Sequence, residues 1–388
     1  MSTYVDILDL ARTNRRNLFN EKRLNKAIAD ARLDAVVAVS KVNITYTGGS
    51  VSQGGNLLAF VVTTAGGKQG LIINEADAYY YGEYSWITTI RSYRYLSNGY
   101  SMNQNSIRLL TEMLKEFGLA NARIGIEIGQ IPTSHFADIK ASLPGVTWEE
   151  GGPVFEYARL VKTPGEIELF RLAARSSDKA IQAAWSTARP GISEKLVAAR
   201  MQSFALQMGA DTLGHCHMQS GLHSTVAHSW PMEKPLLPGE VVHVDFGAGF
   251  GGYYTDFSRN AIVGKATQKQ DRIYRHMWEI EQLLIEDLRP GAIAGDLWDR
   301  TEKAFAKAGL VYPWGTIGHS TGLDVHEGFE ISKGSETLFE AGMIINIEPS
   351  HIEQGDARYH LEDSYLITEK GCELLTDVMD TRGLFPIG

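Results

Sequence analysis

Helix-like and strand-like patterns alternate through the first part of the chain. Apolar residues recur at helical spacing in residues 20–33 and 106–118. Short apolar runs typical of buried strands occupy 34–40, 57–64, 69–74 and 123–128. The letters "AGGK" separate the second run from the third and predict a hairpin. Together these elements predict one α/β layer domain of about 150 residues.

A second set of elements follows a segment rich in glycine and proline at 142–166, where the periodicity is lost. We therefore expect domains at 1–157 and 158–388. Helical patterns in the second domain cover 166–185, 193–209, 269–288 and 293–309, and strand pairs cover 241–257 and 342–368. This order predicts an α+β domain with an antiparallel sheet and helices on one face.

Two aspartates lie on either side of the glycines in "DFGAGFGGYYTD", at positions 245 and 256. If the chain turns between Phe250 and Gly251, paired positions on the two strands sum to 501. Asp245 then lies directly opposite Asp256, with both side chains on one face.

The last strand pair repeats this arrangement. A turn about Gly355 pairs positions that sum to 710, which places Glu348 opposite Glu362. Buried carboxylates without partners cost several kcal/mol each, and no lysine or arginine is spaced to serve both pairs. Either one acid of each pair holds a proton or divalent ions occupy the site. A single acid is usually a solvent-facing residue, but two mirrored pairs inside apolar runs disfavour that interpretation.

Histidines near these acids are candidates for a nitrogen ligand. His319 lies between Gly318 and Gly322, and His326 follows in the same segment. His223 and His228 lie in a loop-like segment before Asp245 and are candidates to polarise a substrate oxygen or hold a substrate carboxylate. Each of these histidines taken alone is equally well explained by packing or surface exposure.

Three further histidines have simpler interpretations. His215 and His217 alternate, which favours one face of a strand over a metal site. His243 shares a face with Asp245, so it either supports a ligand or packs in the core.

Composition narrows the class of partner. The chain has 388 residues, 44% of them apolar, and a net charge of −9 without long basic runs. This balance argues against nucleic acid or a membrane surface as the main partner and favours small molecules or peptides. Only two cysteines occur, which fits a reducing compartment. The first 19 residues lack the pattern of a secretion signal, so we expect a cytoplasmic protein.

The ordered set of acids and histidine closely resembles the two-metal site of the pita-bread-fold peptidases, which include methionine aminopeptidase, prolidase, aminopeptidase P and the metal-free creatinase. The motifs that carry the resemblance are "VDFGAGFGGYYTDFSR", "GHSTGLDVHE", "INIEP" and "HLEDSYLIT". In the first half, "DAVVAVSKVNITYTGG" resembles the N-terminal domain that methionine aminopeptidase lacks. The resemblance implies a creatinase/prolidase-like α/β domain over 1–157 and an α+β pita-bread catalytic domain with an antiparallel sheet over 158–388.

The resemblance also implies a metal-ligand set. In that set Asp245 chelates one ion, Asp256 and Glu362 bridge two ions, and His319 with Glu348 holds the other. Two divalent ions per chain are expected, with manganese first and cobalt, zinc or iron as alternatives.

Catalytic roles follow from the same resemblance. A metal-activated water would be the nucleophile, and Glu348 would accept its proton and pass it to the leaving nitrogen. His228 and His326 match the histidines that contact the substrate and stabilise the tetrahedral intermediate.

Three positions depart from the family pattern. His360 stands where an arginine is frequent, Gly315 where a histidine is frequent, and Gly328 near the place of a common proline. The metal ligands are complete, but the outer substrate shell is altered. His360, His223 and Trp230 are candidates for that shell.

These observations predict a metal-dependent hydrolase of an amide or peptide bond, most like an Xaa-Pro dipeptidase or Xaa-Pro aminopeptidase. The resemblance implies a homodimer. The departures keep open a hydrolase or lyase of a small non-peptide amide or cyclic amide. A non-catalytic binding module of the same fold is a third hypothesis, although such proteins typically lose metal ligands.

Overall fold

The computed structural model describes residues 15–49, 58–94 and 102–388, so the prediction about a secretion signal lies mostly outside the described residues. The chain divides into two compact units, one that ends at Gly165 and one that begins at Glu166. The predicted boundary at 157 and 158 falls within helix α7 (Gly152–Leu160). Among the described residues, none of the helices combines the length and apolarity that a bilayer crossing requires.

The first unit is built on a six-stranded sheet with the order β4-β3-β2-β1-β5-β6. Its strands are β1 (Ala35–Ala38), β2 (Phe60–Thr64), β3 (Gln69–Asn74), β4 (Ile90–Tyr93), β5 (Arg123–Ile126) and β6 (Thr147–Glu150). β2 pairs antiparallel with β1 and with β3, which confirms the predicted hairpin. The other pairs are parallel, as in an α/β layer domain.

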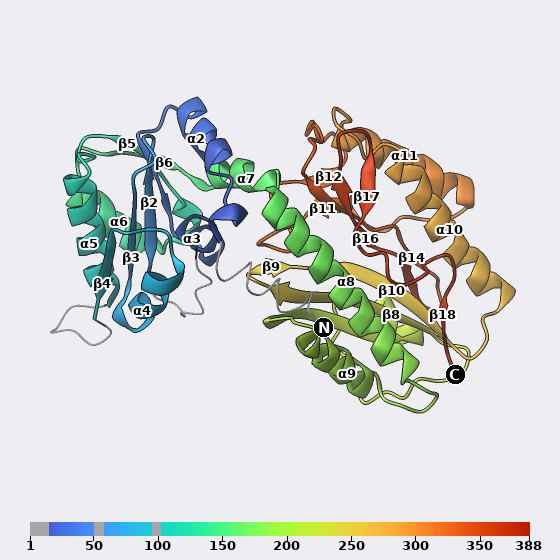
Figure 1. Ribbon diagram of the computed structural model, residues 1–388. Helices are drawn as coiled ribbons and strands as arrows, with labels where there is room; N and C mark the ends of the chain where they lie inside the picture. The colour runs from blue at the N-terminus through green and yellow to red at the C-terminus, as the bar shows by residue number, and fades with distance from the viewer. Residues whose placement is uncertain (1–14, 50–57, 95–101) are drawn as a thin grey trace. The chain divides into compact units, whose positions relative to one another are not determined.

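Helices cover both faces of this sheet (Figure 1). They are η1 (Arg15–Leu18), α2 (Glu21–Asp30), α3 (Lys41–Gly48), α4 (Glu75–Tyr84), α5 (Met102–Glu116), η2 (Ile128–Gln130), α6 (Thr133–Ser142) and α7. Val37, Phe60 and Val62 of the sheet pack with Leu110 and Met113 of α5 in one buried cluster. The alternation of strand residues thus supplies apolar surface to both layers of helices.

The motif Asn43-x-x-Tyr46-x-x-Gly49 has a structural role in this unit. The Asn43 side chain donates to the buried carboxylate of Glu127, and the Tyr46 hydroxyl donates to a carbonyl of α7. Gly49 ends α3 with a φ of 74°, which glycine adopts without strain.

The second unit contains five helical segments and two five-stranded sheets. The helices are α8 (Pro164–Ser186), α9 (Glu194–Gln207), η3 (Gly221–Thr225), α10 (Gln268–Ile285) and α11 (Ala294–Ala308). In Figure 1, α8 and α9 lie near β8 and β10, whereas α10 and α11 lie beside the other sheet.

The strands of the first of these sheets have the order β18-β10-β8-β7, with β9 paired to β8. They are β7 (Thr212–Ser220), β8 (Val241–Phe250), β9 (Tyr253–Tyr254), β10 (Phe257–Val263) and β18 (Phe385–Ile387). All of these pairs are antiparallel except β10 with β18, which is parallel.

The second sheet has the order β12-β11-β13-β16-β17, and β14 pairs with β15 in a separate ribbon. The strands are β11 (Thr316–Ser320), β12 (Glu330–Ser332), β13 (Ile344–Ile347), β14 (Ser350–Ile352), β15 (Arg358–His360), β16 (Asp363–Ile367) and β17 (Cys372–Leu374). The ladder is interrupted between β13 and β14 at Glu348 and Pro349, because proline has no N–H to donate.

The predicted register of the first hairpin is wrong by two residues. Phe250 pairs with Tyr253, and Asp245 pairs with Ser258 instead of Asp256. The turn is formed by Gly251 and Gly252, whose φ values are 57° and 91°. A two-residue turn with positive φ at both central residues favours glycine at both, so the turn takes the glycine pair. A shift of two keeps each side chain on its face, and the two aspartates still share one.

The predicted register of the last strand pair is confirmed. Ile347 pairs with Asp363 and Ser350 pairs with His360, and both pairs sum to the predicted 710. Glu348 and Glu362 therefore lie opposite each other, just outside the two ladders.

Candidate metal centre

The two pairs of acids come together where the two sheets meet. The backbone N–H of Ser258, in β10, donates to the carbonyl of Glu362 at 3.2 Å, and the N–H of Glu362 donates back at 3.3 Å. This reciprocal pair joins the hairpin that carries Asp245 and Asp256 to the strand that begins after Glu362. Residues far apart in sequence thus form one cluster of four carboxylates.

The cluster faces a cavity of about 230 Å³. The side chains around it include all five predicted metal ligands and both predicted substrate-contacting histidines. The cavity is lined by His228, Asp245, Asp256, Trp314, Gly315, Thr316, His319, His326, Glu348, Arg358 and Glu362.

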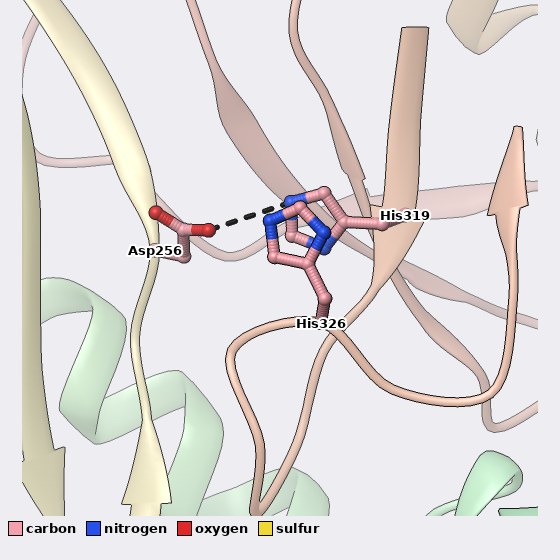
Figure 2. Close-up of side chains that lie close together, drawn as sticks. All are labelled: Asp256, His319 and His326. Carbon is pink, nitrogen blue, oxygen red and sulfur yellow. Dashed lines mark ion pairs between the residues drawn. The ribbon is translucent and has the colours of Figure 1, made fainter. Parts of the chain in front are cut away.

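One side of the cluster carries His319 from β11. Its Nε2 atom lies 3.4 Å from Asp256 Oδ2 and 3.6 Å from Glu362 Oε1. His326 stacks on this ring with centroids 3.6 Å apart, as Figure 2 shows together with the contact to Asp256. His326 itself is exposed, so it lies between the enclosed carboxylates and solvent.

The other side carries a histidine that the sequence interpretation missed. His215 of β7 has its Nε2 atom 2.8 Å from Asp245 Oδ1 and 3.0 Å from Asp256 Oδ1. The alternation of His215 and His217 correctly indicates a strand, but it does not show that the strand lies beside Asp245. The pairing of β7 with β8 could have been suspected only from the proximity of "GHCHMQ" to the ligand strand in sequence.

The carboxylates have strongly perturbed acidities. Burial and the neighbouring Glu362 raise the pKa of Glu348 well above its usual range. Burial and Asp256 raise the pKa of Glu362 to about 7. Burial alone would raise the pKa values of Asp245 and Asp256, but contact with His215 outweighs it and lowers both. The cluster therefore contains more carboxylate charge than the neighbouring imidazoles can neutralise.

This set of donors fits divalent metal ions. Three overlapping groups have ligand atoms within 4.8 Å of one another. They are Asp256 with His319 and His326, His215 with Asp245 and Asp256, and Asp245 with His360 and Glu362. Carboxylate oxygens with added imidazoles suit manganese, iron, cobalt or zinc, and bound cations would offset the repulsion between the acids.

Arg358 also lines the cavity, which corrects the expectation that no arginine is placed to serve both pairs of acids. Its side chain is 3% exposed, its Nε donates to Ser350 Oγ at 3.0 Å, and its guanidinium lies 5.3 Å from the Trp314 ring centroid. Its Nη1 atom has no hydrogen-bond partner among the described residues. Burial lowers the pKa of this guanidinium, although three nearby carboxylates act against that.

The predicted shell residues occupy different places. His228 lines the cavity and is exposed. His223 is hydrogen-bonded at both ring nitrogens, at 2.8 Å to Glu194 and 2.7 Å to Ser229, so it holds the segment around η3 together. Trp230 is 73% exposed, with its ring centroid 6.0 Å from that of His217.

His360 is buried beside the acids. Its Nε2 atom lies 3.6 Å from Glu348 Oε2 and 3.8 Å from Glu362 Oε2. Burial and the charge of Arg358 hold the pKa of His360 well below its usual range, and the same two causes lower the pKa of His243. Both rings are therefore neutral at ordinary pH.

Two buried carboxylates, two partly buried ones and several imidazoles around one cavity, on a frame of two mainly antiparallel sheets, are typical of metal-dependent hydrolases. A family model described as metallopeptidase family M24 matches residues 168–369, and one described as the creatinase/prolidase N-terminal domain matches residues 21–161. The chain belongs to metallopeptidase family M24. The fold class predicted from the sequence and the assignment as a hydrolase are confirmed.

Individual relatives agree with this assignment. The Xaa-Pro dipeptidase of Pyrococcus furiosus is 28% identical over 361 residues, which cover 92% of this chain and 97% of the relative. The solved prolidase structure from the same organism superposes with a TM-score of 0.79 at 26% identity, covering 92% of this chain and all of that one. An X-Pro aminopeptidase structure from Thermotoga maritima gives a TM-score of 0.83 at 20% identity, covering 95% and 100% of the two chains, and shows the shared fold.

Proposed function

We propose that this protein hydrolyses the peptide bond of Xaa-Pro dipeptides at a dinuclear metal site. The observation that carries the proposal is the convergence of Asp245, Asp256, His319, Glu348 and Glu362 on one cavity. The names of the relatives, Xaa-Pro dipeptidase and prolidase, support the same substrate class.

Each residue of the site has a proposed role. Asp245, Asp256 and Glu362 would hold one ion, and Asp256, Glu362, His319 and Glu348 would hold the other. When bound, the ions supply Lewis acidity and lower the pKa of the attacking water.

Proton transfer and substrate binding fall to other groups. Glu348 is partly buried beside the cavity, and burial and the neighbouring Glu362 raise its pKa, so it is the proposed general base and acid. His228 and His326 line the cavity and are exposed, and we assign them to the substrate carbonyl and the tetrahedral intermediate.

The guanidinium of Arg358 supports a dipeptide as the substrate. A buried guanidinium whose Nη1 lacks a partner among the residues that the structure describes favours an anionic ligand, because a carboxylate accepts hydrogen bonds from a guanidinium in matching geometry. The free C-terminal carboxylate of a dipeptide would lie within the cavity, whereas a longer peptide would carry that charge away from it. This feature favours a dipeptidase over an aminopeptidase that acts on longer chains.

The finer properties belong to the same proposal. For the five residues above, four carboxylates and one imidazole favour manganese, with cobalt, zinc or iron as alternatives. A cytoplasmic homodimer fits the composition and the resemblance. A small non-peptide amide or cyclic amide is a second candidate substrate, because His360 and Gly315 replace residues that are frequent in the peptidases.

The test compares an Xaa-Pro dipeptide, its C-terminal amide, a longer Xaa-Pro peptide and a cyclic amide, each with manganese added. We expect the dipeptide to be turned over with the highest kcat/KM. The variant Arg358→Met should raise KM for the dipeptide by about 10- to 100-fold, because a hydrogen bond to a charged group contributes about 1.5–3 kcal/mol. KM for the dipeptide amide should change little.

The amide is the internal control for loss of folding, which would affect both substrates equally. No turnover of any of the three Xaa-Pro compounds by a metal-loaded protein would contradict the proposal, and turnover of the cyclic amide alone would establish the second candidate.

A further inference from the structure

The ion that Asp245 would hold is surrounded by two histidines outside the five-residue set. In that set its ligands are Asp245, Asp256 and Glu362, all of them carboxylates. His215 lies against the first two acids, and His360 lies with the first and the third in a group that could hold a metal. Asp245 belongs to both groups, so the two imidazoles converge on the same end of the site.

The position of His215 matches that of a ligand. Ligand atoms about 2.0–2.2 Å from one ion lie about 3 Å apart when they subtend a right angle. The distances from His215 Nε2 to the two aspartates, 2.8 and 3.0 Å, have this spacing. Without an ion these are hydrogen-bond distances, and the same spacing allows the imidazole nitrogen and the two carboxylate oxygens to bind one ion in place of the proton.

The backbone makes room for the ring of His215. A Cβ atom placed on Gly247 of β8 would lie 2.6 Å from the Thr255 carbonyl oxygen and 2.7 and 2.8 Å from two ring atoms of His215. Any other residue at this position would collide with the imidazole. The register of β7 against β8 also shifts between Leu213 and Cys216, which re-aims the intervening residues.

Hydrogen bonding determines which nitrogen of His243, and in turn of His360, acts as the donor. The Gln219 Nε2 donates to the carbonyls of Val226 and Ser229 at 3.1 and 2.8 Å. Carbonyls only accept, so the side-chain oxygen of Gln219 must be the atom that faces His243 Nδ1 at 3.2 Å. That nitrogen is consequently the donor, and His243 Nε2 carries a lone pair.

The same logic extends one step further along this chain of side chains. His360 Nδ1 lies 3.2 Å from His243 Nε2 and must donate to it. With Nδ1 as the donor, Nε2 is the nitrogen of His360 that can bind an ion, and it faces Glu348 and Glu362 at 3.6 and 3.8 Å. This atom is buried and has no hydrogen-bond partner within the described part of the chain. A cation placed between this nitrogen and the carboxylates would give each of them a partner.

We propose that His215 and His360 are imidazole ligands of the ion held by Asp245, and that Gln219 and His243 are positioning residues that fix the tautomer of His360. The inference rests on the metal site of the proposed function and deepens it. A site with two imidazoles and three carboxylates binds cobalt and zinc more tightly than manganese, whereas a site of carboxylates alone distinguishes these ions less. The ion position at Asp245 is thus the one that distinguishes cobalt and zinc from manganese.

The test is equilibrium binding of Co²⁺ and Mn²⁺ to the full-length protein by calorimetry, with Co²⁺ absorption spectra recorded in parallel. We compare the wild type with His215→Asn and His360→Gln, and with His276→Asn, a histidine of α10 that pairs with Glu279, as a control. In each ligand variant, one of two Co²⁺ ions should bind at least about 10-fold more weakly, and its absorption bands should change. Mn²⁺ affinity should fall less, and the control should bind both ions as the wild type does.

A measurement on the wild type covers the case in which a variant does not fold. In protein labelled with ¹⁵N at histidine, Zn²⁺ should shift the Nε2 resonances of His215 and His360, and the Nδ1 of His360 should be protonated. Gln219→Leu should alter that tautomer and weaken the binding of one of the two Co²⁺ ions.

Metal binding and turnover give separate answers. If both histidine variants bind two Co²⁺ ions with wild-type affinity and spectrum, or if Zn²⁺ leaves both Nε2 resonances unmoved, the inference is wrong while the dipeptidase proposal stands. If the variants lose an ion but metal-loaded wild type cleaves no Xaa-Pro compound, the inference stands and the proposed substrate is wrong.

Discussion

Two clusters of carboxylates, one partly and one fully buried, lie on opposite faces of the same strands. Glu362 contributes to the metal centre, and the next residue, Asp363, turns to the other side. In β10, the Ser258 side chain contacts Glu362, and the Arg259 side chain contacts Asp363 on the other face. Because side chains alternate along a strand, adjacent residues serve two different environments.

The cluster around Arg259 is closed. Arg259 is 1% exposed and contacts Asp178 at 3.2 Å and Asp363 at 2.7 Å, and its remaining N–H groups donate to backbone carbonyls. Asp178 also accepts from the N–H groups of Val378 and Met379. This cluster holds its own cation and joins α8, β10, β16 and the segment after β17.

The cluster at the metal centre is open. Its four acids face a cavity, two of them have raised pKa values, and the Nε2 atom of His360 lies beside two of them. The comparison teaches that burial of acids alone does not identify a binding site. A matched internal cation marks a structural cluster, whereas unmatched charge beside a cavity marks a site for an external cation.

The largest expected effect distinguishes the roles of two adjacent residues, Glu362 and Asp363. Glu362→Gln should lower turnover of an Xaa-Pro dipeptide by about 10³-fold or more and reduce the bound metal below that of the wild type, because a bridging carboxylate is lost. Asp363→Asn should keep the metal and lower the melting temperature instead. Steady-state kinetics, metal analysis and thermal melts of both variants check this division. Wild-type metal content in Glu362→Gln, or native protein free of metal, would refute the assignment of the open cluster.

The next effect concerns the closed cluster. Arg259→Met should destabilise the fold by about 3–5 kcal/mol, because it leaves two buried carboxylates without their cation. Arg175→Met is the matched control, since Arg175 pairs with Asp377 in an ion pair at the surface. Loss of a surface pair should cost about 1 kcal/mol or less. Denaturant unfolding measures both changes, and equal losses in the two variants would show that the buried cluster is not specially stabilising.

The smallest effect tests how the closed cluster balances its charge. Burial and nearby Asp363 raise the pKa of Glu281 in α10 well above its usual range, so the folded protein keeps this carboxyl protonated. The unfolded chain loses the proton near the ordinary value of 4.5. Stability should therefore fall as pH rises from that value towards the folded-state pKa, by at most about 1.4 kcal/mol per pH unit.

Glu281→Gln should remove this part of the pH dependence and be more stable than the wild type at neutral pH. Melting temperatures across the pH range measure the difference between the two proteins. Glu279→Gln, an exposed change in the same helix, should leave the slope intact. A difference that does not vary with pH would show that Glu281 is ionised in the folded state.

The pairing of the acids was predictable from the sequence because strand alternation and turn chemistry are local properties. The turn about Gly355 gave the correct register for Glu348 and Glu362. The error at the first hairpin came from placing Phe250 in the turn, although the Gly251–Gly252 pair is the better type of turn for a hairpin. The shared face of Asp245 and Asp256 survived because the error was an even number of residues.

Residues that depend on tertiary contacts were not predictable in this way. His215 reaches the acids only through the irregular pairing of β7 with β8, and alternation alone carries no information about that neighbour. Arg358 lies in the cavity because the ribbon of β14 and β15 departs from the main sheet after Pro349. The orientation of His360 depends on Gln219 and His243, which belong to two other strands.

The reciprocal hydrogen bonds between Ser258 and Glu362 have a consequence for the order of events during synthesis. The first half of the ligand set is complete when β10 leaves the ribosome, yet its partners arrive only with β13 and β16, and β18 then adds beside β10. About half of this unit is synthesised after Asp256 and before Glu362, and until then the opposite wall of the site is absent. A site that needs both halves is complete only when the last strands have paired with the earlier ones.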